Sequence, residues 1–243
     1  MPWLAITFRL WPRVARGSIG LLAAYVVAAY FLLPWLWWAD ERRQRDVLAG
    51  LPKITRNADG IPGDPLNVAL VGSEAELVRA MLAAGWRPAD PITFRSSVRI
   101  ALSVLLHRPD PDAPVSALYV FGRRQDLAFE QEVGGSADQR HHVRWWQAPV
   151  ADASVRPLWI GSVSFDVGAG VSHRTGQITH HIAPDVDAER DRLMASLAAA
   201  GQLAGRYTVA GVGATRDGRN AGGDRYVTDG AMAVGVLAAG TAP

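Results

Sequence analysis

Hydrophobic positions divide the chain into one long apolar run near the N-terminus and a series of shorter, patterned segments after it. The run from Gly17 to Trp38 contains no charged residue. A helix of roughly 22 residues is about 33 Å long, which is enough to cross the hydrocarbon core of a bilayer. Arginines flank both ends, and tryptophans lie at both edges, as expected at membrane interfaces. The pattern predicts a basic flank at residues 1–16 and a transmembrane helix at residues 17–38.

A cleaved signal peptide is the alternative interpretation of the same run. Bulky Trp35, Trp37 and Trp38 occupy the positions where a signal peptidase site needs small residues. The sequence therefore favours an uncleaved, single-pass anchor in the inner (plasma) membrane. Basic residues at both ends leave the orientation undecided by the positive-inside rule. A lone N-terminal anchor on a soluble domain often exports that domain, which favours the periplasmic side.

Shorter segments after the anchor predict one soluble domain at residues 66–243, joined by a juxtamembrane linker at residues 39–65. Ser73 and Glu76 form a capping box that opens a helix after a buried strand. The predicted helices cover residues 73–84, 94–107 and 184–200. The predicted strands cover residues 66–71, 117–123, 127–133, 141–147, 158–165, 177–182, 206–211 and 225–236. Strand blocks with three scattered helices predict an α+β fold with a mixed, largely antiparallel sheet.

Composition and charge narrow the function classes. The chain has no cysteine, which excludes disulfides, thiolate nucleophiles and cysteine zinc sites. The first 49 residues hold six arginines and three acidic residues; subtracting these from 25 basic and 23 acidic residues leaves 19 basic and 20 acidic in the remainder. A nucleic-acid-binding domain should carry a basic face. The sequence therefore predicts no nucleic-acid partner.

Histidines concentrate in the middle of the predicted domain. Five of the six fall between residues 141 and 181, as the pairs His141–His142 and His180–His181 and the single His173. Neighbouring side chains on a strand point to opposite faces of the sheet. One member of each pair can therefore face a common cleft, while the other faces solvent or the core.

Two chemistries use such a set of residues. A divalent metal site needs two or three histidine nitrogens with a carboxylate, which His142, His181 and Asp166 could supply. Alternatively, arginines and histidines hold a phosphate and a histidine acts as general acid or base. The candidate ligand-binding residues are Arg123, Arg144 and Thr175. The candidate catalytic residues are His142, His173, His181 and Asp185.

A purely structural interpretation competes with both chemistries. Histidines on strands commonly lie at the edge of the core or at the surface without binding a ligand. Asp185 opens a predicted helix, where acidic residues are favoured by the helix dipole whatever the function. His173-Arg174-Thr175 is similar to one half of the paired motif of two-histidine phosphoesterases, but the second half is missing. The residues alone therefore leave the function of the histidines open.

Several ordered motifs between about Asp64 and Gly230 carry a resemblance to a known family. They are Asp64-Pro65-Leu66-Asn67, Val71-Gly72-Ser73, Gly85-Trp86, residues 119–123 (YVFGR), 126–129 (DLAF), 140–145 (RHHVRW), 172–173 (SH), 175–182 (TGQITHHI), 184–187 (PDVD), 189–191 (ERD) and 228–230 (TDG). By these motifs the chain resembles the LssY C-terminal domain family. The resemblance implies a membrane-associated bacterial protein. In fused relatives the neighbouring membrane module is phosphatase-like and acts on lipid phosphates, but no catalytic mechanism transfers to this domain.

The leading hypothesis is a membrane-tethered domain that binds, and in its stronger form hydrolyses, a phosphate-bearing lipid or envelope precursor. The site would centre on His142 and His181 with Asp166 and Asp185. The rival hypothesis is a non-catalytic interaction module of an envelope or export assembly, with structural histidines and an envelope protein as partner. A solute-binding domain without turnover lies between the two.

Overall fold

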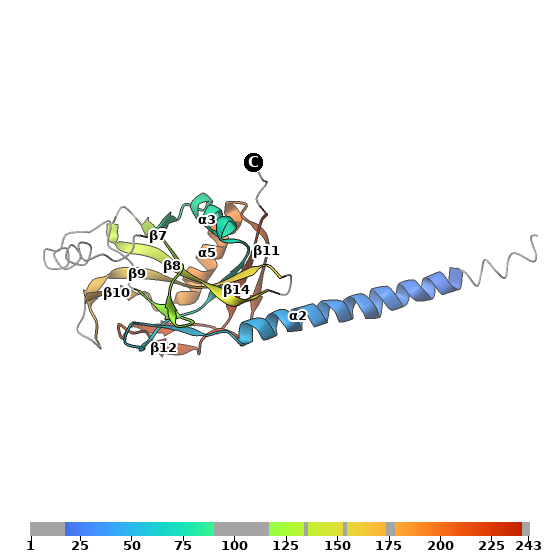
Figure 1. Cartoon of the computed structure of the whole chain (residues 1–243), viewed down its shortest axis with the longest axis horizontal. Helices are drawn as coiled ribbons and strands as arrows, with labels where there is room; N and C mark the ends of the chain where they lie inside the picture. Colours follow the sequence, from blue (N-terminus) through green and yellow to red (C-terminus); the bar gives the residue numbers. More distant parts are fainter. Residues whose placement is uncertain (1–17, 90–116, 134–135, 153–154, 174–177, 240–243) are drawn as a thin grey trace, which may run out of the picture. The chain divides into compact units, whose positions relative to one another are not determined.

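A computed structural model describes residues 18–89, 117–133, 136–152, 155–173 and 178–239 of the chain (Figure 1). The chain separates into two compact units, residues 1–46 and residues 47–243. The first unit holds the apolar helix and the second holds the folded domain, so each is described by itself.

The N-terminal helix runs from Ser18 to Ala49 and is apolar along its first part. A π-helical turn, η1 (Ala28–Leu32), precedes α2 (Leu33–Ala49). Its most apolar window has a mean hydropathy of 2.0, and none of that window is buried within the protein. The helix is therefore long and apolar enough to cross a membrane. It continues well past Trp38, where the sequence predicts the start of a linker.

The domain is built on a mixed eight-stranded sheet in the order β11-β14-β3-β9-β8-β7-β4, with β10 paired to β9. Its strands are β3 (Val68–Val71), β4 (Arg87–Pro88), β7 (Leu127–Val133), β8 (Ser136–Ala151), β9 (Pro157–Val171), β10 (Ile178–Ile182), β11 (Leu203–Val209) and β14 (Met232–Leu237). The β14–β3 pair is parallel, and the other pairs are antiparallel. This confirms the predicted α+β class.

Two smaller sheets accompany the large one. Four short strands pair in the order β2-β1-β5-β6; they are β1 (Ile54–Arg56), β2 (Pro62–Pro65), β5 (Tyr119–Val120) and β6 (Arg123–Arg124). A hairpin is formed by β12 (Asp217–Arg219) and β13 (Arg225–Val227). Part of the predicted linker is therefore sheet, and the segment between the strands predicted at residues 206–211 and 225–236 contains a further strand.

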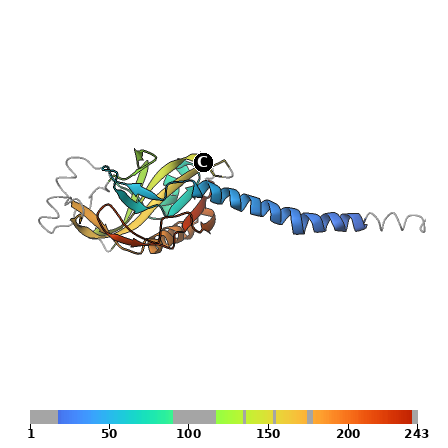
Figure 2. The ribbon, with the colours of Figure 1, turned by 90° about the horizontal axis from the view of Figure 1, so that it is seen from below.

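Helices α3 (Glu74–Ala83) and α5 (Val186–Ala199) cover one face of the large sheet (Figures 1 and 2). Ser73 and Glu76 make the predicted capping box at the start of α3. Leu77 of α3 and Leu193 of α5 pack with Val143 and Trp145 of β8 in one hydrophobic core. The helix predicted at residues 94–107 lies outside the described residues.

A second hydrophobic core lies on the other face of the sheet. There Trp146 of β8 and Ile160 of β9 pack with Leu118 and Val120, which belong to β5 or lie next to it. Leu48 at the end of α2 contributes to the same core. Because the middle of β8 is buried on both faces, its polar residues are enclosed by protein on either side.

Close packing at the centre of the sheet generates a prediction for Gly161 of β9. A Cβ atom there would lie 2.6 Å from Cε3 of Trp145 and 2.8 Å from Cγ2 of Val68. We expect Gly161→Ala to lower the free energy of unfolding by about 1–3 kcal/mol through overpacking. The measurement is urea unfolding of the full chain in detergent, followed by tryptophan fluorescence. Gly205→Ala on β11 is the control, because a Cβ there meets nothing within 4 Å; equal stability losses in the two variants would contradict the packing.

Candidate functional site

Polar residues alternate along β8 on the face opposite helices α3 and α5. Arg140, His142 and Arg144 occupy every second position and so share one face. Val143 and Trp145 point into the helix-covered core instead. On the neighbouring strand β9, Asp166 is the cross-strand partner of Arg140, and Ser164 is that of His142. The register of two strands therefore gathers two cations, an imidazole and a carboxylate.

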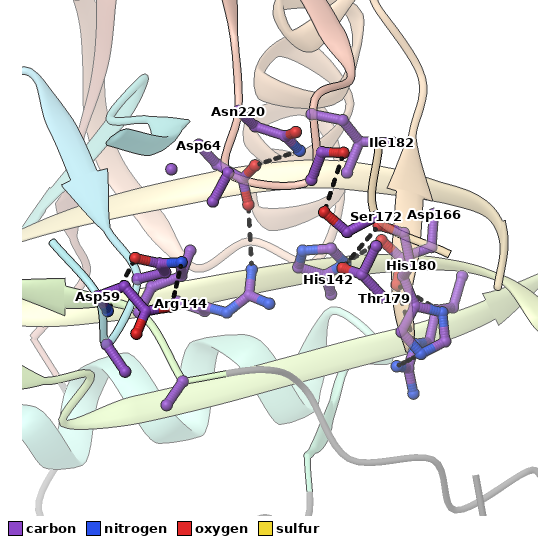
Figure 3. Close-up of a pocket in the computed structure, with 18 residues that line it drawn as sticks. Asp59, Asp64, His142, Arg144, Asp166, Ser172, Thr179, His180, Ile182 and Asn220 are labelled. Carbon is purple, nitrogen blue, oxygen red and sulfur yellow. Dashed lines mark hydrogen bonds and ion pairs between the residues drawn. The ribbon is translucent and has the colours of Figure 1, made fainter. Parts of the chain in front are cut away.

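These side chains line a cavity of about 310 Å³ (Figure 3). Strand β10 adds Thr179 and His180 to its wall, and β2 adds Asp64. The turn after β12 contributes Asn220 and Gly222. Segments far apart in the sequence thus meet around one polar space, which is the arrangement expected of a ligand site.

Asp166 is the centre of the charge network in this cavity. Its Oδ2 accepts a hydrogen bond from Arg140 Nε at 3.2 Å, and its Oδ1 lies 2.9 Å from His142 Nδ1. Arg140 also donates to Glu130 Oε2 at 2.8 Å. All four side chains are buried. A buried charge is tolerated only when it is paired in this way.

His180 is held as a neutral imidazole beside the same pair. Arg140 Nη2 lies 3.2 Å from His180 Nε2, and because a guanidinium only donates, this nitrogen must accept. Nδ1 then carries the proton and lies 3.7 Å from Asp166 Oδ2. Burial lowers the pKa of His180 to about 4; Asp166 opposes that shift and Arg140 reinforces it. At neutral pH the imidazole is therefore uncharged.

The pKa of the Asp166 carboxyl group moves in the direction that keeps it ionised. Burial alone would raise this pKa, but attraction to His142, His180 and Arg140 and a hydrogen bond from His142 hold it well below its usual value. For Glu130, burial outweighs the attraction of Arg140 and Arg87 and raises the pKa. Asp166 is therefore the permanent negative charge that balances Arg140.

Arg144 forms the second charged end of the cavity. Its Nη1 lies 3.5 Å from Asp64 Oδ2, and both side chains are buried. Asp64 Oδ1 accepts a hydrogen bond from Asn220 Nδ2 at 3.1 Å. Burial lowers the pKa of the Arg144 guanidinium, while Asp64 and Asp166 oppose that shift. The 3.5 Å separation from Asp64 is longer than an ideal charged hydrogen bond.

Ser164, His142 and Asp166 are arranged in the order of a nucleophile, a base and an orienting acid. Ser164 Oγ lies 2.9 Å from His142 Nε2, and His142 Nδ1 lies 2.9 Å from Asp166 Oδ1. Ser164 is buried and is not part of the described cavity lining. A nucleophile must reach its substrate, so the Ser164 hydroxyl orients His142 and does not attack a ligand in the cavity.

The structure places one histidine of each predicted pair in the cavity, namely His142 and His180. His141 points to the helix-covered face, where its Nδ1 lies 2.6 Å from Glu189 Oε2 of α5. His181 lies beside Asp224, with its Nδ1 2.7 Å from Asp224 Oδ1. The structure therefore does not bring His181 into the cavity with His142 and Asp166; His180 is the histidine that joins them.

The other predicted site residues are dispersed. Asp185 is exposed and caps α5 by accepting from the Ala188 amide. Arg123 makes two hydrogen bonds to Asp126 and one to the Gln147 carbonyl, and it does not line the cavity. His173 lies near His181, with ring centroids 5.3 Å apart. Thr175 lies outside the described residues.

The cavity residues that the predicted site omits include Arg140, His180, Asp64 and Asn220. Arg140 could have been predicted, because positions 140, 142 and 144 lie on one face of a strand and all carry charged or polar residues. No comparable alternation of polar residues marks Asp64, which lies in the predicted linker, or Asn220, which lies between two predicted strands. Both reach the cavity only through long-range folding.

The fold and the cavity define a class: an α+β domain with a buried arginine–histidine–carboxylate site, preceded by an apolar helix. Comparison with protein families then places the chain. Residues 48–232 match the family described as LssY C-terminus, so the chain belongs to that family. Neither the curated proteins nor the solved structures provide a match.

The buried network generates a stability prediction at Asp166. We expect Asp166→Asn to lower the free energy of unfolding at pH 7 by about 3–5 kcal/mol, because it removes one of the two carboxylates that pair with the buried guanidinium of Arg140. The pKa of Asp166 is lowered in the folded state from 3.8. Its contribution is therefore present above about pH 4 and is lost as the pH falls below that value, so the difference between the variant and the parent should shrink in acid.

The control for Asp166 is Asp217→Asn. Asp217 is exposed and pairs with the exposed Arg225 at 2.8 Å, and such surface pairs contribute little. The measurement is urea unfolding of both variants between pH 3 and pH 7. If the Asp166 variant is as stable as the Asp217 variant at pH 7, Asp166 does not hold the network together.

Proposed function

We propose that the domain binds a phosphate-bearing ligand, a lipid headgroup or envelope precursor, in the cavity between β8, β10 and β2. The observation that carries the proposal is that Arg140, Arg144, His142 and His180 line one polar cavity. Guanidinium groups recognise phosphate oxygens through paired hydrogen bonds. Imidazoles can add hydrogen bonds to the same group.

Arg144 is the residue we assign to the phosphate oxygens. Arg140 is already held by Asp166 Oδ2 and Glu130 Oε2, at 3.2 and 2.8 Å, so its main role is to position the carboxylate and His180. Arg144 lines the cavity, and its Nη1 lies 3.5 Å from Asp64 Oδ2, which is longer than an ideal charged hydrogen bond. A phosphate oxygen can share that guanidinium with Asp64 without breaking the network around Asp166.

The charges of the cavity restrict how an anion is bound. The described lining holds Asp59, Asp64 and Asp166 against two arginines, an excess of one negative charge while the histidines are neutral. A phosphate group therefore needs further positive charge at the site. A cation at the rim of the cavity meets that need.

Binding without turnover is the form of the function that the geometry supports best. The Ser164 hydroxyl does not line the cavity, and both ring nitrogens of His142 lie within 2.9 Å of Ser164 or Asp166. His142 is therefore engaged on both sides and acts as a fixed part of the wall. Hydrolysis is the second candidate, favoured only by the two cavity hydroxyls of Ser172 and Thr179.

The apolar helix supplies the second half of the proposal, a membrane tether. Residues 17–38 would hold the chain as a single-pass protein of the inner membrane, with the domain on the periplasmic side. The support is the helix of Ser18–Ala49, apolar and unburied over its best membrane-spanning window. A tether would keep the cavity near the lipid or envelope precursor whose phosphate it binds.

Arg144 provides the test of anion binding. We expect the full-length protein in detergent to bind dihexanoyl phosphatidic acid, and Arg144→Gln to weaken this binding by about tenfold or more, because a charged hydrogen bond contributes about 1.5–3 kcal/mol. Arg144→Lys should recover part of the affinity, since it keeps the charge but not the fork. The measurement is isothermal titration calorimetry, with inorganic phosphate titrated separately.

Arg123→Gln is the control for this experiment, because Arg123 lies outside the cavity and is already bound to Asp126. Its affinity for the phosphate probes should equal that of the parent. Thermal unfolding of each variant shows whether an affinity loss reflects unfolding. If the parent binds neither probe, or if Arg144→Gln and Arg123→Gln behave alike, the phosphate site is wrong and the non-catalytic interaction module becomes the better function.

The absence of cysteine allows a direct test of the membrane orientation. Ala204 on β11 is exposed, so Ala204→Cys introduces one accessible thiol. We expect a membrane-impermeant maleimide to label this variant in spheroplasts of an expressing bacterium. The same variant in permeabilised spheroplasts gives the maximum signal, and labelling found only after permeabilisation would place the domain in the cytoplasm.

A further inference from the structure

Two histidines and one carboxylate converge beside the cavity, outside the network around Asp166. They are His173, which follows β9, His181 of β10, and Asp224, which precedes β13. One potential ligand atom from each residue lies within 4.8 Å of the others. We propose that these three side chains bind a divalent transition-metal ion, with a fourth coordination position open toward a ligand of the cavity.

The donor set has the chemistry of a catalytic-type metal site. Two imidazoles and one carboxylate are the protein ligands of many zinc sites that keep one position for water or substrate, and the same combination suits other divalent transition metals. His181 Nδ1 and Asp224 Oδ1 are 2.7 Å apart. A metal ion replaces the proton that these two atoms share, with a small separation of the pair to coordination distances and release of that proton.

The three ligands are held in place by contacts around them. Asp224 Oδ2 accepts from the Ile182 amide at 3.3 Å and from Asn220 Nδ2 at 3.4 Å, which leaves Oδ1 directed at His181. The His173 amide donates to the Gly222 carbonyl at 2.9 Å. Outer contacts of this kind fix ligand orientation in metal sites. Three chain segments are thus locked together at the point where their donors meet.

Gly170 on β9 shows that the His181 ring needs space at this position. A Cβ atom on Gly170 would lie 2.6 Å from His181 Nε2. The edge of the imidazole formed by Nε2 and Cδ2 therefore lies against the glycine, and Nδ1 lies 2.7 Å from Asp224 Oδ1. A side chain at position 170 would displace the ring without removing any of the three donors, which provides a variant independent of the ligands themselves.

The neighbours of the three ligands in sequence line the cavity. Ser172, His180 and Gly222 are cavity residues, and each lies within two positions of one proposed ligand. A divalent ion at this rim supplies the positive charge that the carboxylate-rich lining lacks for an anion. This link to phosphate rests on the proposed function, whereas metal binding itself does not.

The experiment measures metal and phosphate separately on the full-length protein in detergent. After removal of metal with a chelator, Zn²⁺ is titrated in competition with a chromophoric chelator, and Co²⁺ is added to record its visible absorption. We expect one Zn²⁺ per chain and Co²⁺ bands of a four-coordinate site. His173→Gln and His181→Gln should each weaken Zn²⁺ binding by at least about tenfold, and Gly170→Ala should alter the Co²⁺ spectrum.

His142→Gln is the matched control, because this histidine is engaged by Ser164 and Asp166 in the cavity; its Zn²⁺ affinity should equal that of the parent. His173 is exposed, so its variant tests the site without disturbing the core. Absence of stoichiometric Zn²⁺ in the parent, or unchanged affinity in both the His173 and His181 variants, would overturn the metal site.

Phosphate titration of the metal-free and Zn²⁺-loaded protein separates this proposal from the proposed function. Tighter phosphate binding in the loaded protein supports both the site and its link to the cavity. One equivalent of Zn²⁺ without any effect on phosphate binding supports the metal site and rejects the link. Phosphate binding without any bound Zn²⁺ rejects the metal site and leaves the proposed function in place.

Discussion

The buried carboxylate of Asp166 is the group on which the charged part of the structure depends. It lies on β9, contacts Arg140 and His142 of β8, and faces His180 of β10. An ionised carboxylate in a low-dielectric interior costs several kcal/mol, which only well-placed partners offset. Without Asp166, Arg140 would keep its hydrogen bond to Glu130 but lose a second buried carboxylate. His180 would lose the negative charge that opposes the lowering of its pKa.

Stability alone gives no reason for such a cluster. Buried ion pairs are commonly replaced by apolar residues of similar size without loss of stability. The same sheet face carries an apolar core around Trp146 and Ile160, so the fold can fill this layer with hydrophobic side chains. The change from apolar packing to arginine, histidine and aspartate along one face marks the cavity as a functional region, which is why we favour ligand binding over a structural role.

Much of the fold follows from local sequence patterns. For the histidine pairs, these patterns indicate which histidine faces the cavity in β8 but not in β10. Alternation predicts that one histidine of each pair faces a cleft, and in β8 the polar positions 140, 142 and 144 identify which one. In β10 the residues around the two histidines do not alternate between polar and apolar, so the sequence does not indicate which histidine faces the cavity. A register shift between β10 and β9 next to Ile182 decides that His180, and not His181, meets Asp166.

The remaining parts of the site depend on contacts between distant segments. Asp64 lies in a stretch that the sequence predicts as a linker, yet β2 pairs with β1 and brings it to Arg144. Asn220 and Asp224 come from a turn whose glycines indicate only a loop, and their partners, Asp64 and His181, are contributed by other strands. Local propensity cannot encode such pairings, because they exist only once the strands have assembled.

The pairing of each cavity arginine with a carboxylate has a consequence for affinity. Because each cavity arginine already faces a carboxylate, an incoming phosphate displaces or shares existing interactions, so its net gain is smaller than at an uncompensated cationic site. Such a site selects among anions by geometry. An anion that cannot reach the Arg144 guanidinium cannot replace or share the contact that Asp64 already makes with it. A membrane tether offsets a modest intrinsic affinity by raising the effective concentration of headgroups near the domain. The apolar helix and the cavity with its paired charges are therefore complementary features of one proposed binding function.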